Sequence, residues 1–393
     1  MKNNSMNIPK YILFTLLGGL IGSIVTFLLI DNTGINTKCN VTSINDSKFE
    51  PVMEAYNTIK NEYYKDIDDS VLIDGMINGL MSATGDPHTT YYNESETSNF
   101  EAELSGKYYG IGAQIYQNDD NNVSVNLIFD NSPAEKAGLK VGDTFISVDE
   151  ESVLGKTPTE VSSLLRSPDN PKAKVVVKRG EEEVNIEIEK SMVEISSVSS
   201  EMLDNNIGYI SLSTFNSLTD DQFSDALTKL DKEGAKSLII DLRGNGGGYL
   251  STVTNIISKF VNKKTVIYQI KDKKSTEKYY SLNDSTLNYK VVILINEESA
   301  SASEIMCSAL QEQYGAILVG KTTFGKGTVQ EVRELPNKTV FKFTTQEWLT
   351  SKGKSINGVG VKPDYDIDLP EDYYSNPTLE NDTQLQKAIE LLK

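Results

Sequence analysis

The sequence predicts an α/β core preceded by a β-rich unit and an N-terminal helical segment. From residue 205 onward, short apolar runs alternate with amphipathic helical patterns, which is typical of α/β proteins. Residues 105–190 instead contain short strand patterns separated by turn residues, together with two capped helix starts. Residues 49–104 show helical periodicity. With 393 residues, the chain is long enough for two or three domains.

The first 48 residues contain a candidate membrane anchor. Residues 12–30 are uncharged and mostly apolar, and as a helix they would be about 28 Å long, close to the hydrocarbon thickness of a bilayer. Lysines in residues 1–11 predict that this end stays in the cytoplasm. A cleaved signal peptide is the alternative, although its apolar region is normally shorter and ends at a small-residue cleavage site. We expect a single uncleaved transmembrane helix, a polar linker over residues 31–48, and the rest of the chain outside a bacterial cytoplasm.

The composition restricts the possible chemistry. A formal net charge of −18 disfavours binding to nucleic acid, so we expect no nucleic-acid partner. Two cysteines, Cys39 and Cys307, cannot form a disulfide framework or, alone, a four-ligand zinc site. Any histidine-based catalysis would have to use His88, the one histidine. We expect no metal and no cofactor, and a small buried side chain at Cys307.

A turn follows the second apolar pattern of the helical segment 49–104. That pattern begins after Asp69-Ser70 and is followed by Gly-Asp-Pro-His at residues 85–88. We therefore expect His88 to be a turn or packing residue, far from any site in the α/β core. The apolar residues at helical spacing are Val52, Tyr56, Ile59 and Tyr63, then Leu72, Met76, Leu80 and Ala83.

Residues 105–190 resemble a PDZ domain. Two stretches carry this resemblance, Tyr-Gly-Ile-Gly at residues 109–112 and Ser-Pro-Ala-Glu-Lys-Ala-Gly-Leu-Lys-Val-Gly-Asp at residues 132–143. Main-chain N–H groups of such a loop can bind a terminal carboxylate, and the adjacent strand edge can accept an extended peptide. Glycines in a turn more often serve backbone geometry alone, so the loop by itself is weak evidence. The resemblance implies that a peptide C-terminus binds at Tyr109, Gly110, Ile111 and Gly112.

Two unusual loops follow buried strands of the α/β region. Asp-Leu-Arg-Gly-Asn-Gly-Gly-Gly occupies residues 241–248, and a serine-rich run occupies residues 299–303. Each loop leads from the carboxyl end of a strand into a helix. Ligand-binding and catalytic sites of α/β proteins favour that edge of the sheet. A third glycine-rich stretch, Phe-Gly-Lys-Gly at residues 324–327, comes just after the next strand.

A serine at a helix start is most often only a cap, but it also lies beside N–H groups that can stabilise an oxyanion. A nucleophilic serine needs a base, and a lysine near neutral pH needs its pKa lowered by about 3 units, or roughly 4–5 kcal/mol, through burial. Lys326 lies between two glycines and follows Phe324, an apolar setting for a lysine. From spacing alone, an ordinary surface lysine remains the alternative.

Residues 299–330 resemble the signature of the carboxyl-terminal processing peptidases, also called tail-specific proteases. That family has Ser-Ala-Ser-Ala-Ser-Glu followed 25 residues later by a lysine in Phe-Gly-Lys-Gly, and Asp-Leu-Arg-x-Asn-x-Gly-Gly earlier in the chain. Gly-Asp-Pro at residues 85–87 and Gly-Val-Gly-Val-Lys-Pro-Asp at residues 358–364 extend the similarity over residues 50–368. The resemblance implies a nucleophile at Ser301, a general base at Lys326, an orienting Gln330, and oxyanion donors at Gly247 and Ala302.

The same resemblance implies the architecture. We expect a crotonase-like (Clp-protease-like) α/β protease core over residues 191–368, with a PDZ domain over 105–190 and a helical region over 49–104. Apolar residues at helical spacing near the end of the chain predict, independently of the resemblance, that residues 369–393 form a helical tail that packs on the core or on a second subunit. Glu298 departs from the family, which usually has Gly there, and its carboxylate could alter the pKa of Lys326.

We therefore expect a membrane-anchored serine endopeptidase that cleaves proteins near their C-termini, using a Ser-Lys dyad and a PDZ domain that binds the substrate C-terminus. A homodimer is possible. A catalytically inert, tethered PDZ peptide receptor is the alternative, and an enzyme acting on acyl thioesters is a second one. An inert receptor is expected to have lost Ser301 or Lys326, and both residues are present.

Overall fold

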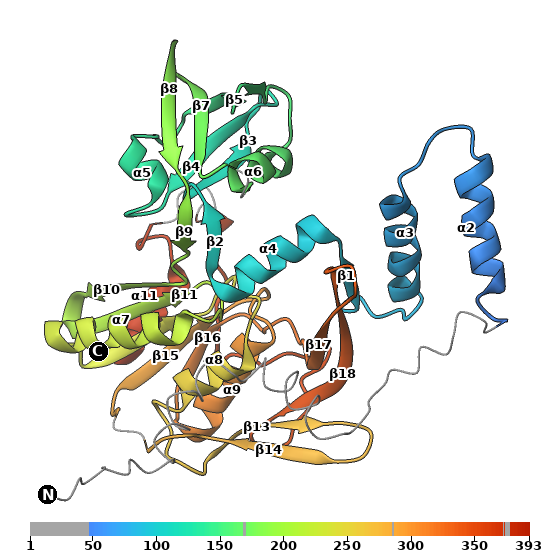
Figure 1. Ribbon diagram of the computed structural model, residues 1–393. Coiled ribbons are helices and arrows are strands. Elements are labelled where there is room, and N and C mark those ends of the chain that lie inside the picture. Colours follow the sequence, from blue (N-terminus) through green and yellow to red (C-terminus); the bar gives the residue numbers. More distant parts are fainter. Residues whose placement is uncertain (1–46, 168–169, 285–286, 372, 374–377) are drawn as a thin grey trace, which may run out of the picture. The chain divides into compact units, whose positions relative to one another are not determined.

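The computed structural model describes residues 47–167, 170–284, 287–371, 373 and 378–393 (Figure 1). These residues fall into two units, the first ending at Ile77 and the second beginning at Asn78. The expected anchor at residues 12–30 and nearly all of the linker lie outside the described residues. Within the described part of the chain, no helix is long and apolar enough to cross a membrane.

The first unit contains two helices, α2 (Glu50–Glu62) and the first part of α3 (Asp69–Ser82). An ion pair between Lys60 and Asp69, with Nζ and Oδ1 2.7 Å apart, joins the two helices. Tyr56 also donates a hydrogen bond to Asp69 Oδ1 over 3.0 Å. The helical periodicity is confirmed here, but its apolar side chains are exposed, including Phe49, Val52, Met53, Ile59 and Tyr63.

In the second unit, the end of α3 is followed by a turn and a strand that the helical pattern did not predict. β1 (Thr90–Tyr92) pairs antiparallel with β18 (Val340–Thr350), with Thr90 opposite Lys342. The threonine and tyrosines of β1 are residues that fit a pleated, half-buried surface, and they are too few to show a period. Helix α4 (Glu94–Ser105) follows, capped by Asn93.

The PDZ region forms a sheet in the order β3-β4-β5-β7-β8, with β6 paired to β5. Both predicted helix starts are confirmed, because Ser132 caps α5 (Pro133–Ala137) and Thr157 caps α6 (Pro158–Arg166). A separate two-stranded sheet of β2 (Lys107–Gly110) and β9 (Ser191–Glu194) flanks it in sequence. The strands are β3 Ala113–Gln117, β4 Val123–Ile128, β5 Thr144–Val148, β6 Glu151–Ser152, β7 Lys172–Arg179 and β8 Glu182–Glu189.

The α/β core is built on a second six-stranded sheet in the order β10-β11-β12-β15-β16-β19. All neighbours are parallel except β10 and β11. On β12, Leu238 and Ile240 face the cluster formed with α7, α8 and α9, whereas Ile239 faces the opposite cluster. Side chains alternate along a strand, so a continuous apolar run is what a sheet covered on both faces requires. The elements are β10 Val198–Leu203, β11 Ile207–Leu212, α7 Thr219–Glu233, β12 Ser237–Asp241, α8 Leu250–Ile257, β15 Lys290–Ile295, α9 Ala302–Gln313, β16 Ile317–Gly320 and β19 Tyr365–Asp366.

The opposite face of that sheet is covered by the C-terminal helix α11 (Thr383–Leu392). Leu385 and Ala388 are buried there against strand residues. The tail was expected to pack either on the core or on a second subunit, and the structure shows it packed on the core.

A fourth sheet, with five strands, was not predicted from the sequence. Its order is β1-β18-β13-β14, with β17 (Thr328–Glu334) paired to β18. β13 (Val266–Lys271) and β14 (Thr276–Tyr280) complete it. This sheet matters for the site because β17 begins two residues after Lys326 and contains Gln330.

Candidate active site

Ser301 lies at the start of α9, directly after the turn that follows β15. Its backbone has φ 55° and ψ −114°, a conformation that costs energy for a residue with a side chain. The turn before it is fixed by Ser299, whose buried hydroxyl donates to the Leu242 carbonyl over 2.8 Å and accepts from the Asn296 N–H over 3.0 Å. Contacts with the loop after β12 therefore hold Ser301 in a strained turn.

The glycine-rich loop after β12 presses against this turn. Gly247 has φ 109°, and a Cβ there would come within 2.9 Å of Ser301 Cβ and 3.1 Å of the Ala302 nitrogen. Only a glycine permits this approach, so the structure brings together the three residues expected at the nucleophile and the oxyanion site. The Gly247 N–H, however, donates to Asn245 Oδ1 over 2.9 Å in this structure.

Glu304, in the first turn of α9, was not singled out from the sequence. Its side chain is fully buried and accepts four hydrogen bonds. Oε2 accepts from the N–H groups of Ser301 (2.9 Å) and Lys326 (2.8 Å). Oε1 accepts from the Thr323 hydroxyl (2.6 Å) and the Gly325 N–H (2.7 Å). One carboxylate thus joins the main chain of the serine turn to the main chain of the lysine loop.

Lys326 lies in the loop between β16 and β17 and is partly buried. Burial lowers the pKa of its amine below the ordinary value, and the positive charge of Lys342 lowers it further. Asp86 and Glu304 act in the opposite direction on this pKa, but they do not outweigh burial. Of the carboxylates, it is Asp86 and Glu304 that act on Lys326, rather than Glu298, which is exposed.

His88 lies in a turn, as expected, but the expectation that it is far from the site is wrong. Burial and the charge of Lys326 lower the pKa of its imidazole, so the two side chains are within electrostatic reach of each other. The pairing of β1 with β18 explains this, because it brings the turn at residues 85–89 to the sheet that carries the lysine loop. A pairing between residues so distant in sequence leaves no local signal.

Gln330 lies on β17, opposite Thr344 on β18. Its side-chain Nε2 donates to the hydroxyls of Thr328 (2.8 Å) and Thr344 (3.2 Å). The Thr344 hydroxyl in turn donates to Asp86 Oδ2 over 2.6 Å. Gln330 is thus held in a polar network that includes the turn containing His88.

The four residues predicted to bind a carboxylate lie at the end of β2 and in the loop before β3. Ile111 is buried, and Gly112 has φ 80°, with no room for a Cβ beside Ser132. The neighbouring Tyr108 is buried beneath Arg166, whose guanidinium lies 4.6 Å from the ring centre. Burial raises the pKa of the Tyr108 phenol, against the effects of Arg166 and of main-chain hydrogen bonds from Gly112 and the next residue. The Tyr108 phenol oxygen therefore occupies the Gly112 N–H, one of the main-chain donors of the predicted carboxylate loop.

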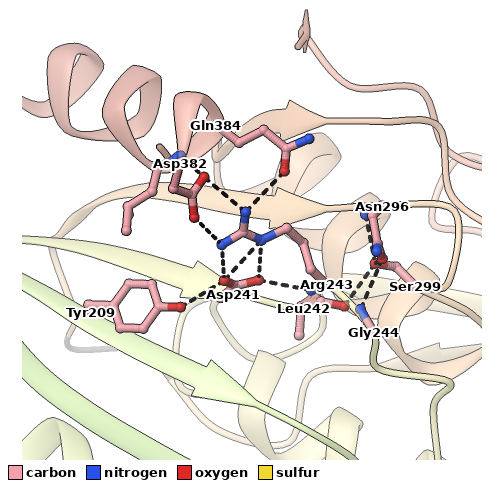
Figure 2. Close-up of polar contacts among 10 residues, drawn as sticks. Tyr209, Asp241, Leu242, Arg243, Gly244, Asn296, Ser299, Asp382 and Gln384 are labelled. Atoms are coloured by element: carbon pink, nitrogen blue, oxygen red, sulfur yellow. Dashed lines mark hydrogen bonds and ion pairs between the residues drawn. The ribbon is translucent and has the colours of Figure 1, made fainter. Parts of the chain in front are cut away.

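A buried ion-pair network holds the other end of the glycine-rich loop (Figure 2). The Arg243 guanidinium pairs with Asp241 at 2.6 Å and with Asp382 at 2.9 Å. Gln384 accepts a further hydrogen bond from Arg243, and Tyr209 donates one to Asp241. Burial alone would lower the pKa of Arg243, but its carboxylate partners raise it above its usual value. The tail therefore stabilises the loop from which Gly247 extends.

Replacing Asp382 by alanine should destabilise the protein by about 3 kcal/mol. The change leaves Arg243 buried with one carboxylate and removes the Asp382 cap of α11, which accepts from the Leu385 N–H over 2.8 Å. Urea unfolding would measure the loss, with the exposed Glu380→Ala as control. Equal midpoints for the two variants would contradict this account of the network.

Cys307 is fully buried in α9, as expected. Burial raises the pKa of its thiol well above the ordinary value. A buried, protonated thiol is a packing residue rather than a nucleophile.

A cavity of about 370 Å³ is lined mainly by residues of α8, β13, β14, β17 and β18. One wall comes from the start of α8, three residues after Gly247, and another from β17 three residues after Lys326. The lining is mixed apolar and hydroxylic, and includes Leu250, Thr254, Tyr268, Ile270, Val329 and Gln346.

Comparison with known proteins identifies the family. Peptidase family S41 matches residues 206–367, the PDZ domain matches residues 125–179, and the N-terminal domain of the activating protease CtpB matches residues 26–97. The chain is 36% identical to the carboxy-terminal processing protease CtpA of Bacillus subtilis, covering 95% of this chain and 80% of that protein. It is 34% identical to a "Probable CtpA-like serine protease" of Staphylococcus haemolyticus, over 86% and 68% of the two chains.

A solved S41-type structure from Bacteroides fragilis has the same fold, with a TM-score of 0.51 and 16% identity over 86% of this chain and 96% of that one. The matches to the PDZ domain and to peptidase family S41, and the identity to the Bacillus protein, all indicate the same family. The chain belongs to the carboxy-terminal processing proteases, the PDZ-containing serine peptidases of family S41.

Proposed function

We propose that this chain is a membrane-anchored serine endopeptidase that cleaves protein substrates near their C-termini, with Ser301 as nucleophile and Lys326 as general base. One observation carries the proposal: the main-chain N–H groups of Ser301 and Lys326 bind the same oxygen, Glu304 Oε2. This shared acceptor brings a strained serine at a helix N-terminus next to a lysine whose pKa is lowered by burial. Both are features that activate a serine without histidine.

The reaction is an acyl transfer in two halves. Neutral Lys326 takes the proton from Ser301 Oγ as that oxygen bonds to the carbonyl carbon of the scissile peptide. The tetrahedral intermediate collapses, the C–N bond breaks, and the lysine ammonium returns the proton to the leaving amine. A water molecule then gives a proton to Lys326 and attacks the acyl-enzyme, and release of Ser301 Oγ with that proton regenerates the resting enzyme.

The oxyanion of the intermediate would accept hydrogen bonds from the Ala302 and Gly247 N–H groups. Ala302 is the first residue of α9, so its N–H lies at the positive end of the helix. The Gly247 N–H must first exchange its Asn245 acceptor for the oxyanion. The close approach of Gly247 to the Ala302 nitrogen supports a shared role.

Substrate would bind at two places. Its C-terminal carboxylate would take the N–H groups of the loop at residues 109–112, displacing the Tyr108 phenol from Gly112. The cavity between α8 and β17 has a size and lining that suit an apolar side chain of the substrate. No cofactor takes part in any of these steps.

The location outside the bacterial cytoplasm, with residues 12–30 as the anchor, is part of the same proposal and rests on their length and apolarity. A homodimer would bury the exposed apolar side chains of the first unit, such as Val52 and Ile59.

The test is cleavage of casein by the full chain in detergent, together with labelling by a serine-directed acylating probe. We expect Ser301→Ala to abolish both, lowering cleavage by at least about a thousandfold. Ser163→Ala, on an exposed helix position, is the matched control and should behave as wild type. Absence of labelling in the wild type would favour the inert PDZ receptor instead.

A further inference from the structure

The turn before β1 contains a carboxylate with three hydrogen-bond donors around it. Asp86 accepts from the His88 N–H (2.9 Å), the Thr89 hydroxyl (2.7 Å) and the Thr344 hydroxyl (2.6 Å). Burial alone would raise the pKa of Asp86, but these hydrogen bonds outweigh it and the pKa is lowered. Asp86 is therefore ionised at neutral pH and can only accept hydrogen bonds.

This charge imposes a direction on the hydrogen bonds that follow. A threonine hydroxyl has one hydrogen, and Thr344 gives it to Asp86. Thr344 can then only accept from Gln330, so Nε2 of the amide must face it, at 3.2 Å. The second amide hydrogen goes to Thr328 at 2.8 Å. Both N–H donors of the Gln330 amide thus bond to residues of the paired strands β17 and β18, and its carbonyl Oε1 is left as a hydrogen-bond acceptor.

We propose that Asp86 is a positioning residue for the dyad: acting through Thr344, it fixes the side-chain amide of Gln330 so that Oε1, rather than Nε2, faces Lys326. A neutral lysine amine has two hydrogens and one lone pair. An acceptor that holds one hydrogen turns the lone pair toward Ser301. The relay rests on the proposed roles of Ser301 and Lys326 and on the orienting role that the family resemblance implies for Gln330, and it adds Asp86 and Thr344 to them.

The geometry also separates two effects of Asp86. Its negative charge acts directly on Lys326 and raises the pKa of the amine, whereas its acceptor oxygen acts on Gln330 through a hydroxyl. The other charged or titratable groups that act on Lys326 are Glu304, Lys342 and His88. Removing the Thr344 hydroxyl leaves all of these charges in place, so it isolates the relay.

The experiment measures kcat and KM for a casein-derived peptide with the full chain in detergent, across pH 6–10. Thr344→Val should lower kcat about 10- to 100-fold with little change in KM, and Thr344→Ser should restore most of it. The matched control is Thr345→Val on the same strand, because the Thr345 hydroxyl is buried without a hydrogen-bond partner. We expect that control to keep wild-type kcat.

Asp86→Asn gives a second readout, because an amide can donate to Thr344 and reverse the relay. Its kcat should fall at least as far as that of Thr344→Val. The midpoint of its pH profile should also move to lower pH, since the charge that raises the pKa of Lys326 is gone. Thr344→Val should show no such downward shift.

A double-mutant cycle tests whether Thr344 acts through Gln330. If Thr344 acts through Gln330, the double variant Gln330→Ala/Thr344→Val should be no slower than Gln330→Ala alone. Additive losses, or wild-type kcat in Thr344→Val, would overturn the relay. These outcomes are distinct from failure of the proposed function, in which the enzyme would not require Lys326 or would not label at Ser301.

Discussion

Replacing Lys326 by alanine is expected to lower kcat/KM for protein cleavage by about a thousandfold while leaving the protein folded. The base is lost, but the structural contacts of this residue use its main chain. Its N–H donates to Glu304 over 2.8 Å, and its carbonyl accepts from the Trp348 indole over 2.8 Å. Circular dichroism and urea unfolding should therefore match the wild type.

The wild-type pH profile should rise as Lys326 loses its proton. The amine is a base only when neutral, and its pKa lies below the ordinary 10.5 because of burial and the nearby Lys342. Activity is therefore low at pH 6 and increases with pH, with a midpoint below 10.5. A histidine base would behave differently, because the pKa of His88 is lowered from 6.5 and its activity would already be level above neutral pH.

His88→Gln is the matched control for the lysine variant, since the two side chains are within electrostatic reach. We expect it to retain most of the activity. Cleavage that survives in Lys326→Ala, or is lost in His88→Gln with a profile level above pH 7, would reject the lysine as the base.

Glu304→Gln is expected to cost about 3 kcal/mol of stability and to lower kcat about a hundredfold. The buried carboxylate accepts four hydrogen bonds, two at each oxygen. An amide has one acceptor oxygen, so its NH2 group would face two donors that lose their partner. If the NH2 group takes the position that Oε2 has in the wild type, the N–H groups of Ser301 and Lys326 lose their acceptor.

Glu312→Gln tests whether this effect is specific. Glu312 lies on the same helix and accepts from Thr350 and from the Lys352 N–H, but it has no contact with either proposed catalytic loop. It should lose some stability and keep wild-type kcat. Equal kcat in the two variants would contradict the role of Glu304 in joining the serine turn to the lysine loop.

Much of the fold could be predicted from local patterns. The capping sequences before α5 and α6 and the apolar runs of β12 and β15 were predicted correctly, because caps and burial are encoded within a few residues. The hairpin β17–β18 and strand β1 were not. Their half-buried residues show no clear alternation, and what makes them strands is pairing with distant partners.

The sequence by itself determined the family, because the motifs at residues 241–248, 299–304 and 324–327 are local runs of residues, and the resemblance to that family implied the proposed nucleophile and base. It also predicted that the glycine-rich loop and the serine-rich loop lie at the same edge of the sheet, since both follow the carboxyl ends of strands. Only the tertiary structure decided which residues hold them. Thr344 lies 258 residues from Asp86, and Asp382 lies 139 residues from Arg243. Hydrogen bonds over such separations depend on where the folded chain returns, and no local pattern of residues encodes that.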